Sequence, residues 1–160
     1  MSNNDIQQQT TVNIQEKANL IWAIADKLVG VYKPHEYGNV ILPMCVIKRF
    51  EDTLYPTKEK VLKKNEELDK DGIVVKKGFL ESAAEQKFYN LSPFDFQKLL
   101  NDPENIKVNF ESYLNHFSDN VIDIIHRMDF DREIEKMADN GVLYLVIKEF
   151  CTPQAYLGAD

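Results

Sequence analysis

The sequence predicts an all-α fold, an irregular multi-helix bundle with at most a short hairpin near residues 69–78. Apolar residues recur at helical spacing along most of the 160 residues, and connections marked by proline or glycine separate these stretches. Strand-like alternation is nearly absent. The length suits one domain with a single core. We therefore expect about seven or eight helices and little strand.

The first helix is expected to begin near Ile14, after a polar leader over residues 1–13 that we expect to be mobile. Gly30 and Pro34 should end this helix. The residues with the spacing of one buried face are Ala18, Ile21, Trp22, Ala25, Leu28, Val29 and Tyr32. We expect this face to pack in the core.

The second helix carries apolar residues around most of its circumference, which indicates a central, buried helix. These residues are Val40, Ile41, Leu42, Met44, Cys45, Val46, Ile47 and Phe50. Pro43 lies inside the pattern and lacks a backbone donor, so the helix either starts near Val40 or bends there. Tyr55-Pro56 marks the next joint, and a polar, basic helix should run from Thr57 to Leu68.

Residues 69–78 break the helical period with Asp-Gly and Ile-Val-Val sequences, which fit a short hairpin or a surface excursion. Ser92-Pro93 predicts an N-cap with proline at the first helical position, and Asp102-Pro103 repeats that pattern. Four later helices are expected from their apolar spacing. The first carries Ile106, Phe110, Tyr113, Leu114 and Phe117, and the second, after a cap at Ser118 or Asp119, carries Val121, Ile122, Ile125 and Met128. The third carries Ile134 and Met137, and the last runs from Val142 to Phe150 and ends before Pro153. The helical domain should therefore span residues 14–153, and residues 154–160 should begin a linker.

The formal net charge of −7 argues against a protein that wraps nucleic acid by bulk electrostatics. The charge is unevenly distributed, because residues 48–64 carry +3 and residues 118–160 carry −5. The cations of the basic stretch are Lys48, Arg49, Lys58, Lys60, Lys63 and Lys64. They are candidates for contact with a DNA backbone or with an acidic partner, although solvated surface charge is the more common meaning of such a run.

Recognisable catalytic, cofactor-binding or metal-binding patterns are missing from the sequence. The three histidines, His35, His116 and His126, have no metal-ligand spacing, and Cys45 and Cys151 form no CxxC pair. Asp129 and Asp131 suit the first turn of a helix better than an ion site. We therefore expect no catalytic, cofactor or metal residue in this chain.

Aromatic residues follow the helical periods from Phe88 to Phe117, which favours packing in a core over stacking on bases. The N-terminus lacks the pattern of a secretory signal, and no apolar run has the length of a membrane span. We expect a cytoplasmic protein with free thiols and no membrane partner.

Several motifs occur in the order found in one family. They are the segments Ile21 to Leu28, Tyr37 to Pro43, Lys48 to Glu51, Phe88 to Ser92, Phe117 to Val121, and Phe130-Asp131 through Val142-Leu143. Over residues 15–153 the chain resembles the helical N-terminal domain of the modification subunit of type I restriction-modification systems.

The resemblance implies a Rossmann-like methyltransferase domain after this one, which binds S-adenosylmethionine and methylates the exocyclic amine of adenine in a bipartite DNA site. The glycine-rich loop and Asn-Pro-Pro-aromatic motif of that domain are absent here, so no catalytic residue can be assigned and the chain alone should be inactive. The implied partners are the specificity subunit, a second modification subunit, DNA and, in the full system, the restriction subunit.

An alternative is a free-standing α-helical protein-interaction module unrelated to DNA. The two hypotheses differ in whether the chain continues beyond Asp160. A sequence that ends at Gly158-Ala159-Asp160 without a C-terminal cap indicates truncation, whereas a native stop there would favour the alternative.

Overall fold

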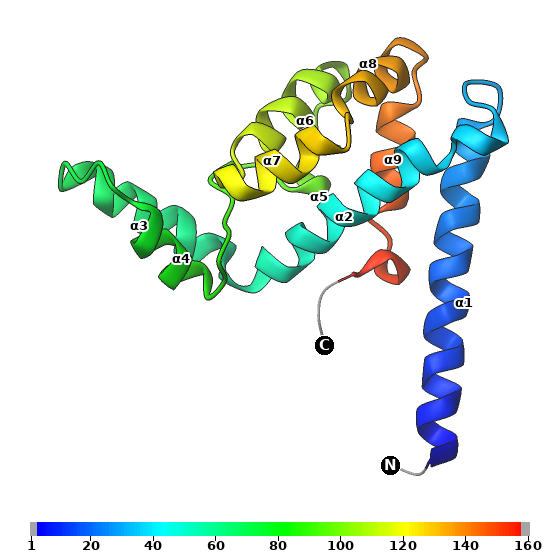
Figure 1. The fold of residues 1–160 in the computed structure, drawn as a ribbon, viewed down its shortest axis with the longest axis horizontal. Coiled ribbons are helices and arrows are strands. Elements are labelled where there is room, and N and C mark those ends of the chain that lie inside the picture. The colour runs from blue at the N-terminus through cyan, green and yellow to red at the C-terminus, as the bar shows by residue number, and fades with distance from the viewer. Residues whose placement is uncertain (1–2, 158–160) are drawn as a thin grey trace.

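The computed structural model describes residues 3–157, and within that range the secondary structure is helical with no strand (Figure 1). The predicted all-α class is confirmed. The α-helices are α1 (Asn3–Leu28), α2 (Gly38–Leu54), α3 (Lys58–Lys70), α4 (Lys77–Ala84), α5 (Phe96–Leu99), α6 (Ile106–Asn115), α7 (Asp119–Arg127), α8 (Asp131–Asp139) and α9 (Leu143–Glu149). Short 3-10 turns are η1 (Pro34–Glu36), η2 (Tyr55–Thr57), η3 (Pro103–Asn105) and η4 (Pro153–Ala155).

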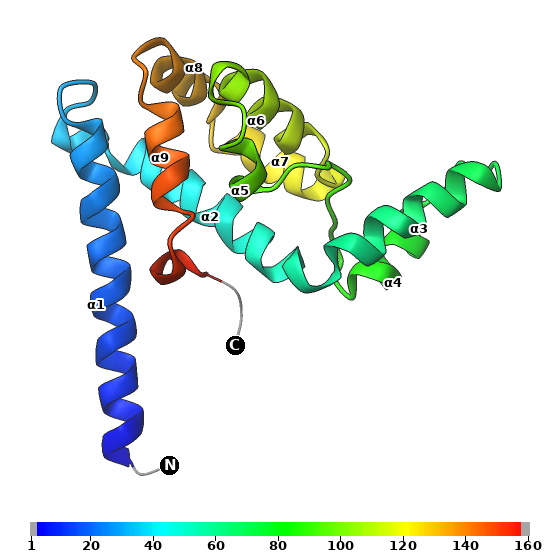
Figure 2. The ribbon, with the colours of Figure 1, turned by 180° about the vertical axis from the view of Figure 1, so that it is seen from behind.

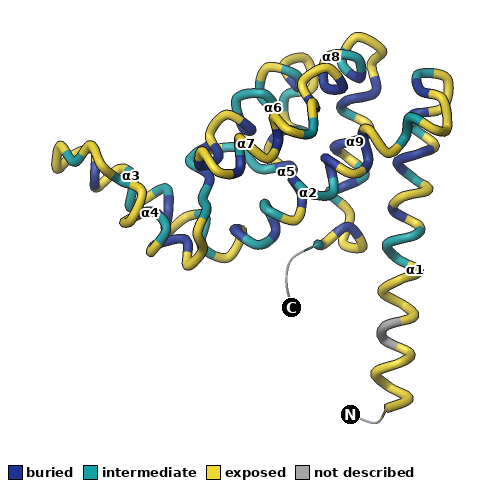
Figure 3. Tube along the Cα trace, in the orientation of Figure 1, coloured by how far each residue is buried: buried dark blue, intermediate teal, exposed yellow. Residues whose placement is uncertain are grey.

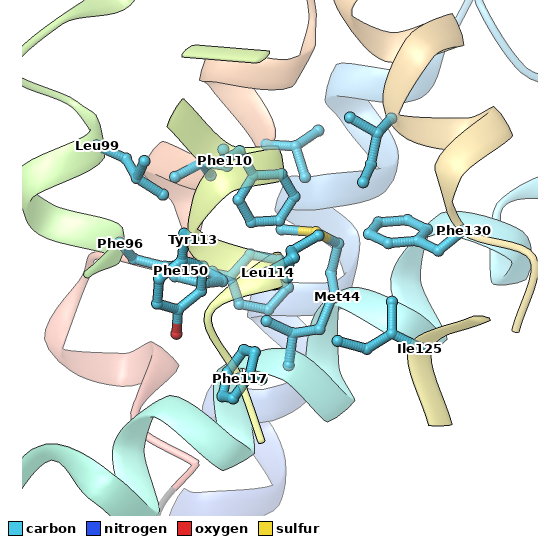
Figure 4. Close-up of a cluster of buried hydrophobic side chains, with 14 of the residues drawn as sticks. Met44, Phe96, Leu99, Phe110, Tyr113, Leu114, Phe117, Ile125, Phe130 and Phe150 are labelled. Atoms are coloured by element: carbon cyan, nitrogen blue, oxygen red, sulfur yellow. The ribbon is translucent and has the colours of Figure 1, made fainter. Parts of the chain in front are cut away.

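The core lies between α2 and the group of helices from α5 to α9 (Figure 4). Phe96 is at its centre, with its ring edge-to-face against Phe110, Tyr113 and Phe150 at centroid separations of 6.0 Å. Met44 contributes the flexible thioether of α2 to the same cluster and is fully buried. The prediction that these aromatic residues pack in a core is confirmed.

Helix α2 begins at Gly38, ahead of the expected start near Val40, and continues through Pro43. Gly30 has the left-handed φ of 85° that lets the chain turn after α1. Ser118 is the N-cap of α7, as expected. The cap expected at Ser92 lies instead at Asp95, whose carboxylate accepts the Lys98 N–H at 2.7 Å, because the chain after Pro93 first makes a further turn.

Helix α1 begins at Asn3 and not near Ile14, so the expected leader is helical over its described part. The reason is that residues 3–13 contain no glycine or proline, and a helix that is docked at one end propagates through polar residues of moderate propensity. The side chains described in this half of α1 are exposed (Figure 3).

The buried face of α1 and of the turn after it agrees with the predicted one only in part. Ala25, Leu28 and Tyr32 are buried as predicted, but Ile21, Trp22 and Val29 are exposed. Leu20 and Ile24, which were not predicted, are buried where α9 and η4 pack on the helix. The apolar surface of α1 is wider than the side that its neighbours cover, so periodicity alone does not fix the edges of the buried face.

Helices α3 and α4 form a helical hairpin that projects from the body as an arm (Figures 1 and 2). Of the two alternatives for residues 69–78, a short β-hairpin or a surface excursion, the structure shows the second, because Gly72, at a φ of 70°, ends α3 and lets the Ile73 N–H bond back to the Leu68 carbonyl at 2.9 Å. The inner side of the arm consists of Val61, Leu68, Leu80, Ala83 and Ala84, all buried.

Residues 154–157, expected to begin a linker, fold back onto the body. Ala155 is fully buried, and η4 lies against α1. The cause is a set of hydrogen bonds: Lys17 of α1 and Lys48 and Arg49 of α2 donate to this segment, and Asp52 of α2 accepts from it. We call residues 153–157 the strap.

Candidate functional site

The structure separates the predicted cations into groups with different surroundings. Lys48 and Arg49 lie on α2 beside the strap, Lys58 lies at the base of the arm, and Lys60, Lys63 and Lys64 lie along α3. The six side chains therefore do not form one continuous basic surface.

Lys48 is buried in an ion pair. Its ammonium is 2.6 Å from the Asp52 carboxylate one helical turn later, and the exposed fractions of these residues are only 6% and 7%. Lys48 also donates to the Ala155 carbonyl at 3.4 Å. A cation held in this way does not offer a free charge to a phosphate.

The strap is held through its main chain. Asp52 accepts the Leu157 N–H at 2.7 Å, and Arg49 donates to the Leu157 carbonyl at 3.0 Å. From α1, Lys17 donates to the Gln154 carbonyl at 3.2 Å and to the Tyr156 carbonyl. Since these bonds reach backbone atoms, they fix the path of the strap whatever its side chains are.

Lys58 caps the junction between the arm and the body. Its ammonium donates to the Asn90 side-chain oxygen at 3.1 Å and to the Phe94 carbonyl at 3.2 Å, and lies 5.6 Å from the centre of the Tyr113 ring. Burial lowers the pKa of Lys58 to about 8, although Glu51 and Asp95 oppose that shift. Lys58 therefore has a structural role at this junction.

Glu51 faces the same junction from α2. Its carboxylate accepts the Phe96 N–H at 2.8 Å, and desolvation raises its pKa to about 7 against the opposing effects of that bond and of Lys48. The buried hydroxyl of Tyr113 also meets this carboxylate, and burial raises the Tyr113 pKa. Within the described residues, no cation lies within ion-pair distance of Glu51.

A cavity of about 410 Å³ opens beside these groups. Its lining includes Glu51, Lys58, Asn90, Asp95, Lys98 and Tyr113. Such a set can exchange protons and donate or accept hydrogen bonds near neutral pH, but it contains no nucleophile paired with a base. Sequence reasoning missed Glu51, and the available signal was a carboxylate in a helix that is otherwise apolar around most of its circumference.

Lys60, Lys63 and Lys64 form the remaining group, on the face of α3 that borders α4. They line a hollow of about 420 Å³ together with Glu67 and Phe79. Lys64 is 3.8 Å from the Glu67 carboxylate and 5.7 Å from the Phe79 ring centre. Lys60 and Lys63 are exposed, and no ion pair involving either is found among residues 3–157.

No group of three or more His, Cys, Asp and Glu side chains in the described range is placed to hold a metal ion. Cys45 and Cys151 are free and half-buried, and burial raises the pKa of both thiols, that of Cys151 to about 11. None of the helices in residues 3–157 combines the length and the apolar character needed to cross a membrane.

Comparison with known proteins gives a family for this fold. The family model described as the HsdM N-terminal domain matches residues 17–150. Searches of curated proteins and of solved structures found no match. The matched range includes α2, the arm, the cavity and the aromatic core. Because the match spans most of the chain, this protein belongs to the family of HsdM N-terminal domains, which are part of the modification, or methyltransferase, subunit of type I restriction-modification systems.

Proposed function

We propose that this domain is the accessory and assembly domain of an adenine-N6 DNA methyltransferase subunit. It packs on a catalytic domain that uses S-adenosylmethionine, and it helps the complex with the specificity subunit and a second modification subunit close on DNA. The restriction subunit joins in the full system. A complex acting on cellular DNA would work in the cytoplasm, and this domain alone is not expected to methylate DNA.

The observation that carries the DNA-closing role is the basic face of the arm. Lys60 and Lys63 are exposed on a helix that stands clear of the body, and Lys64 lies beside them (Figure 1). Phosphate contacts require accessible cations and a surface that a duplex can approach. The other predicted cations do not offer such contacts, because Lys48 and Lys58 are engaged inside the protein and Arg49 holds the strap.

The test replaces Lys60, Lys63 and Lys64 together by alanine in the assembled complex and measures DNA binding over a range of salt concentrations. We expect weaker binding to all sequences and a salt slope smaller in magnitude by up to about 3, since each lost phosphate contact removes about 0.9 from the slope.

A matched control replaces Lys33, Lys107 and Lys148, which lie away from the arm and change the net charge equally. This control should keep the wild-type slope. An arm variant with an unchanged slope, or equal losses in both variants, would reject the contact.

A further inference from the structure

Phe79 is an exposed aromatic residue on α4. All nine phenylalanines lie within the described residues, and Phe79 is the one that is exposed, with 48% of its surface open to solvent. Its neighbour Leu80 belongs to the buried inner side of the arm, and successive helical residues are rotated by about 100°, so the Phe79 ring lies beside that inner side. A single exposed ring is ordinary on a protein surface. The surroundings of this ring indicate what it can bind.

The ring borders the basic hollow between α3 and α4. The hollow contains three lysines and one glutamate, a net charge of +2. Its residues recur every three or four positions on each helix, so one face of α3 and one face of α4 turn to the same side of the arm. They are Lys60, Lys63, Lys64 and Glu67 of α3 and Phe79, Ser82 and Ala83 of α4. Because the arm projects from the body, a large ligand can reach this side (Figures 1 and 2).

The position of Lys64 shows that one face of the Phe79 ring opens into the hollow. The Lys64 ammonium lies over the ring at 5.7 Å from its centre and is 3.8 Å from the Glu67 carboxylate. Both contacts are weak at an exposed site. A nucleic-acid base stacks more strongly on an aromatic ring. A base can therefore take the place of this ammonium, which is then free to contact a phosphate.

The two ends of the hollow differ in charge, which favours a nucleotide over a simple anion. Lys60 and Lys63 are exposed at one end, and Glu67 lies seven residues after Lys60, roughly 10 Å along the helix. A phosphate is attracted to the lysines and repelled by Glu67. The Glu67 carboxylate can instead accept an N–H from the exocyclic amine of a base. Phosphate, flat ring and amine occur together in a nucleotide.

We propose that this hollow binds one unpaired nucleotide of a DNA strand, with the phosphate between Lys60 and Lys63 and the base stacked on the Phe79 ring. A paired base cannot stack there, because neighbouring base pairs cover both of its faces. Methylation of a base amine requires the base to leave the stack, so DNA in the proposed complex contains an unpaired nucleotide. The source of that nucleotide rests on the proposed function, whereas the hollow belongs to this chain alone.

The test adds DNA to the 160-residue chain at low salt and follows binding by NMR spectroscopy. The probes are a short adenine-rich single strand, the duplex that it forms with its complement, and adenosine monophosphate. We expect the single strand to move the Phe79 ring protons upfield, because a stacked base shields them, whereas both forms of DNA should shift the Lys60 and Lys63 amides. Adenosine monophosphate should bind more weakly than the strand, since it lacks the neighbouring phosphates.

Phe79→Leu removes the ring and keeps an apolar side chain. It should weaken binding of the single strand by about tenfold or more, the effect of losing one stacked base, and leave duplex binding unchanged. Phe79→Trp should bind the strand at least as tightly as the wild type, because the larger ring offers more stacking area. Trp22→Leu is the matched control, since Trp22 is an aromatic residue that is 71% exposed but lies on α1. It should bind all probes as the wild type does.

Circular dichroism checks that each variant folds, and if Phe79→Leu does not, the ring-proton shifts of the wild-type chain decide. Three results would overturn the proposal. The single strand leaves the Phe79 ring protons unmoved; Phe79→Leu weakens single-strand and duplex binding equally, which assigns the ring a structural role in the arm; or adenosine monophosphate binds as tightly as the strand, which makes the hollow a site for a free nucleotide. None of these results changes the salt slope expected for the arm lysines in the assembled complex, so the two proposals fail separately.

Discussion

Lys48 and Asp52 form a buried ion pair, which gives Lys48 a structural role in place of the DNA contact considered from the sequence. Both side chains are buried, and each also bonds to the strap. Asp52→Asn keeps an acceptor for the Leu157 N–H but leaves the Lys48 charge buried without its partner. We expect the free energy of unfolding, measured by urea denaturation, to fall by about 3 kcal/mol.

Glu67→Gln is the control for this prediction, because Glu67 pairs with Lys64 at the surface. That pair should contribute less than about 1 kcal/mol. Equal effects of the two substitutions would show that Lys48 and Asp52 are solvated in solution.

Glu51 should make stability depend on pH. Its pKa is raised from 4.5 to about 7 in the folded protein, mainly by desolvation. The folded chain therefore holds this proton more tightly than the unfolded chain, and the resulting stability is full below pH 4.5 and lost as the pH rises to 7. Glu51→Gln mimics the protonated state, so its advantage over the wild type should grow across this window and then level off.

The measurement is urea denaturation of both proteins at a series of pH values, with exposed Glu59→Gln as the control at the same cavity rim. We expect a gain of about 2 kcal/mol for Glu51→Gln near neutral pH, a figure reduced for partial solvent access. A constant difference at all pH values would mean that Glu51 does not titrate in this window. Lys58 adds the opposite trend, because its lowered pKa makes stability rise from pH 8 to 10.5.

The roles of these residues could be predicted from the sequence only in part. The spacing of Lys48 and Asp52 is that of an ion pair on one helix face. Their burial depends on the strap, more than 100 residues later, which no local pattern indicates. Glu51 likewise becomes desolvated only because Phe96 and Tyr113 arrive from α5 and α6.

Elements whose own sequence contains the deciding pattern, such as an apolar period or a cap, were predicted well. The helix α2, the cap at Ser118 and the acidic first turn of α8 at Asp131 all appear in the structure, although the predicted burial of α2 fails at Leu42, which is 68% exposed. Predictions failed where the deciding contact lies outside the element, as for the docked side of α1. In residues 73–75 the β-branched sequence has strand propensity but no neighbouring strand, so the arm forms from helices instead.

The arm should open independently of the body. Its two helices pack mainly on each other, and its base is tied by Lys58 and by the Thr57 hydroxyl, which donates to the Ala84 carbonyl at 3.0 Å. Leu68 is buried between the helices. We expect Leu68→Ala to speed amide hydrogen exchange in α3 and α4 by a factor of about 30 or more, equivalent to at least about 2 kcal/mol, while α6 and α9 keep wild-type exchange.

Leu99→Ala, in the centre of the body, is the comparison for the arm variant. It should raise exchange in α6 and α9 as well. If Leu68→Ala raised exchange equally in all helices, the arm and the body would form one cooperative unit.

The basic and the acidic residues lie in different parts of the molecule. The basic face of the arm lies at one end, and the acidic residues 118–160 belong to the body and strap over their described part. This arrangement lets a chain of net charge −7 approach a polyanion with one part only. Helix α1 lies at the opposite end of the molecule from the arm (Figures 1 and 2).

The extended shape itself can be measured. The accessible surface is 9878 Å², whereas a compact protein of 18.6 kDa exposes about 8,200 Å². The excess arises because α1, about 39 Å long from its 26 residues, and the arm both project from the body. We expect small-angle X-ray scattering of the chain, extrapolated to low concentration, to give a radius of gyration clearly above the value of about 15 Å for a compact chain of this length.

Deleting residues 3–13 should lower the radius of gyration, because those residues extend the free half of α1 by about 1.5 Å each, or roughly 16 Å in all, away from the body. The scattering curves of the chain with and without these residues measure the difference. A compact radius that this deletion leaves unchanged would mean that α1 folds against the body in solution.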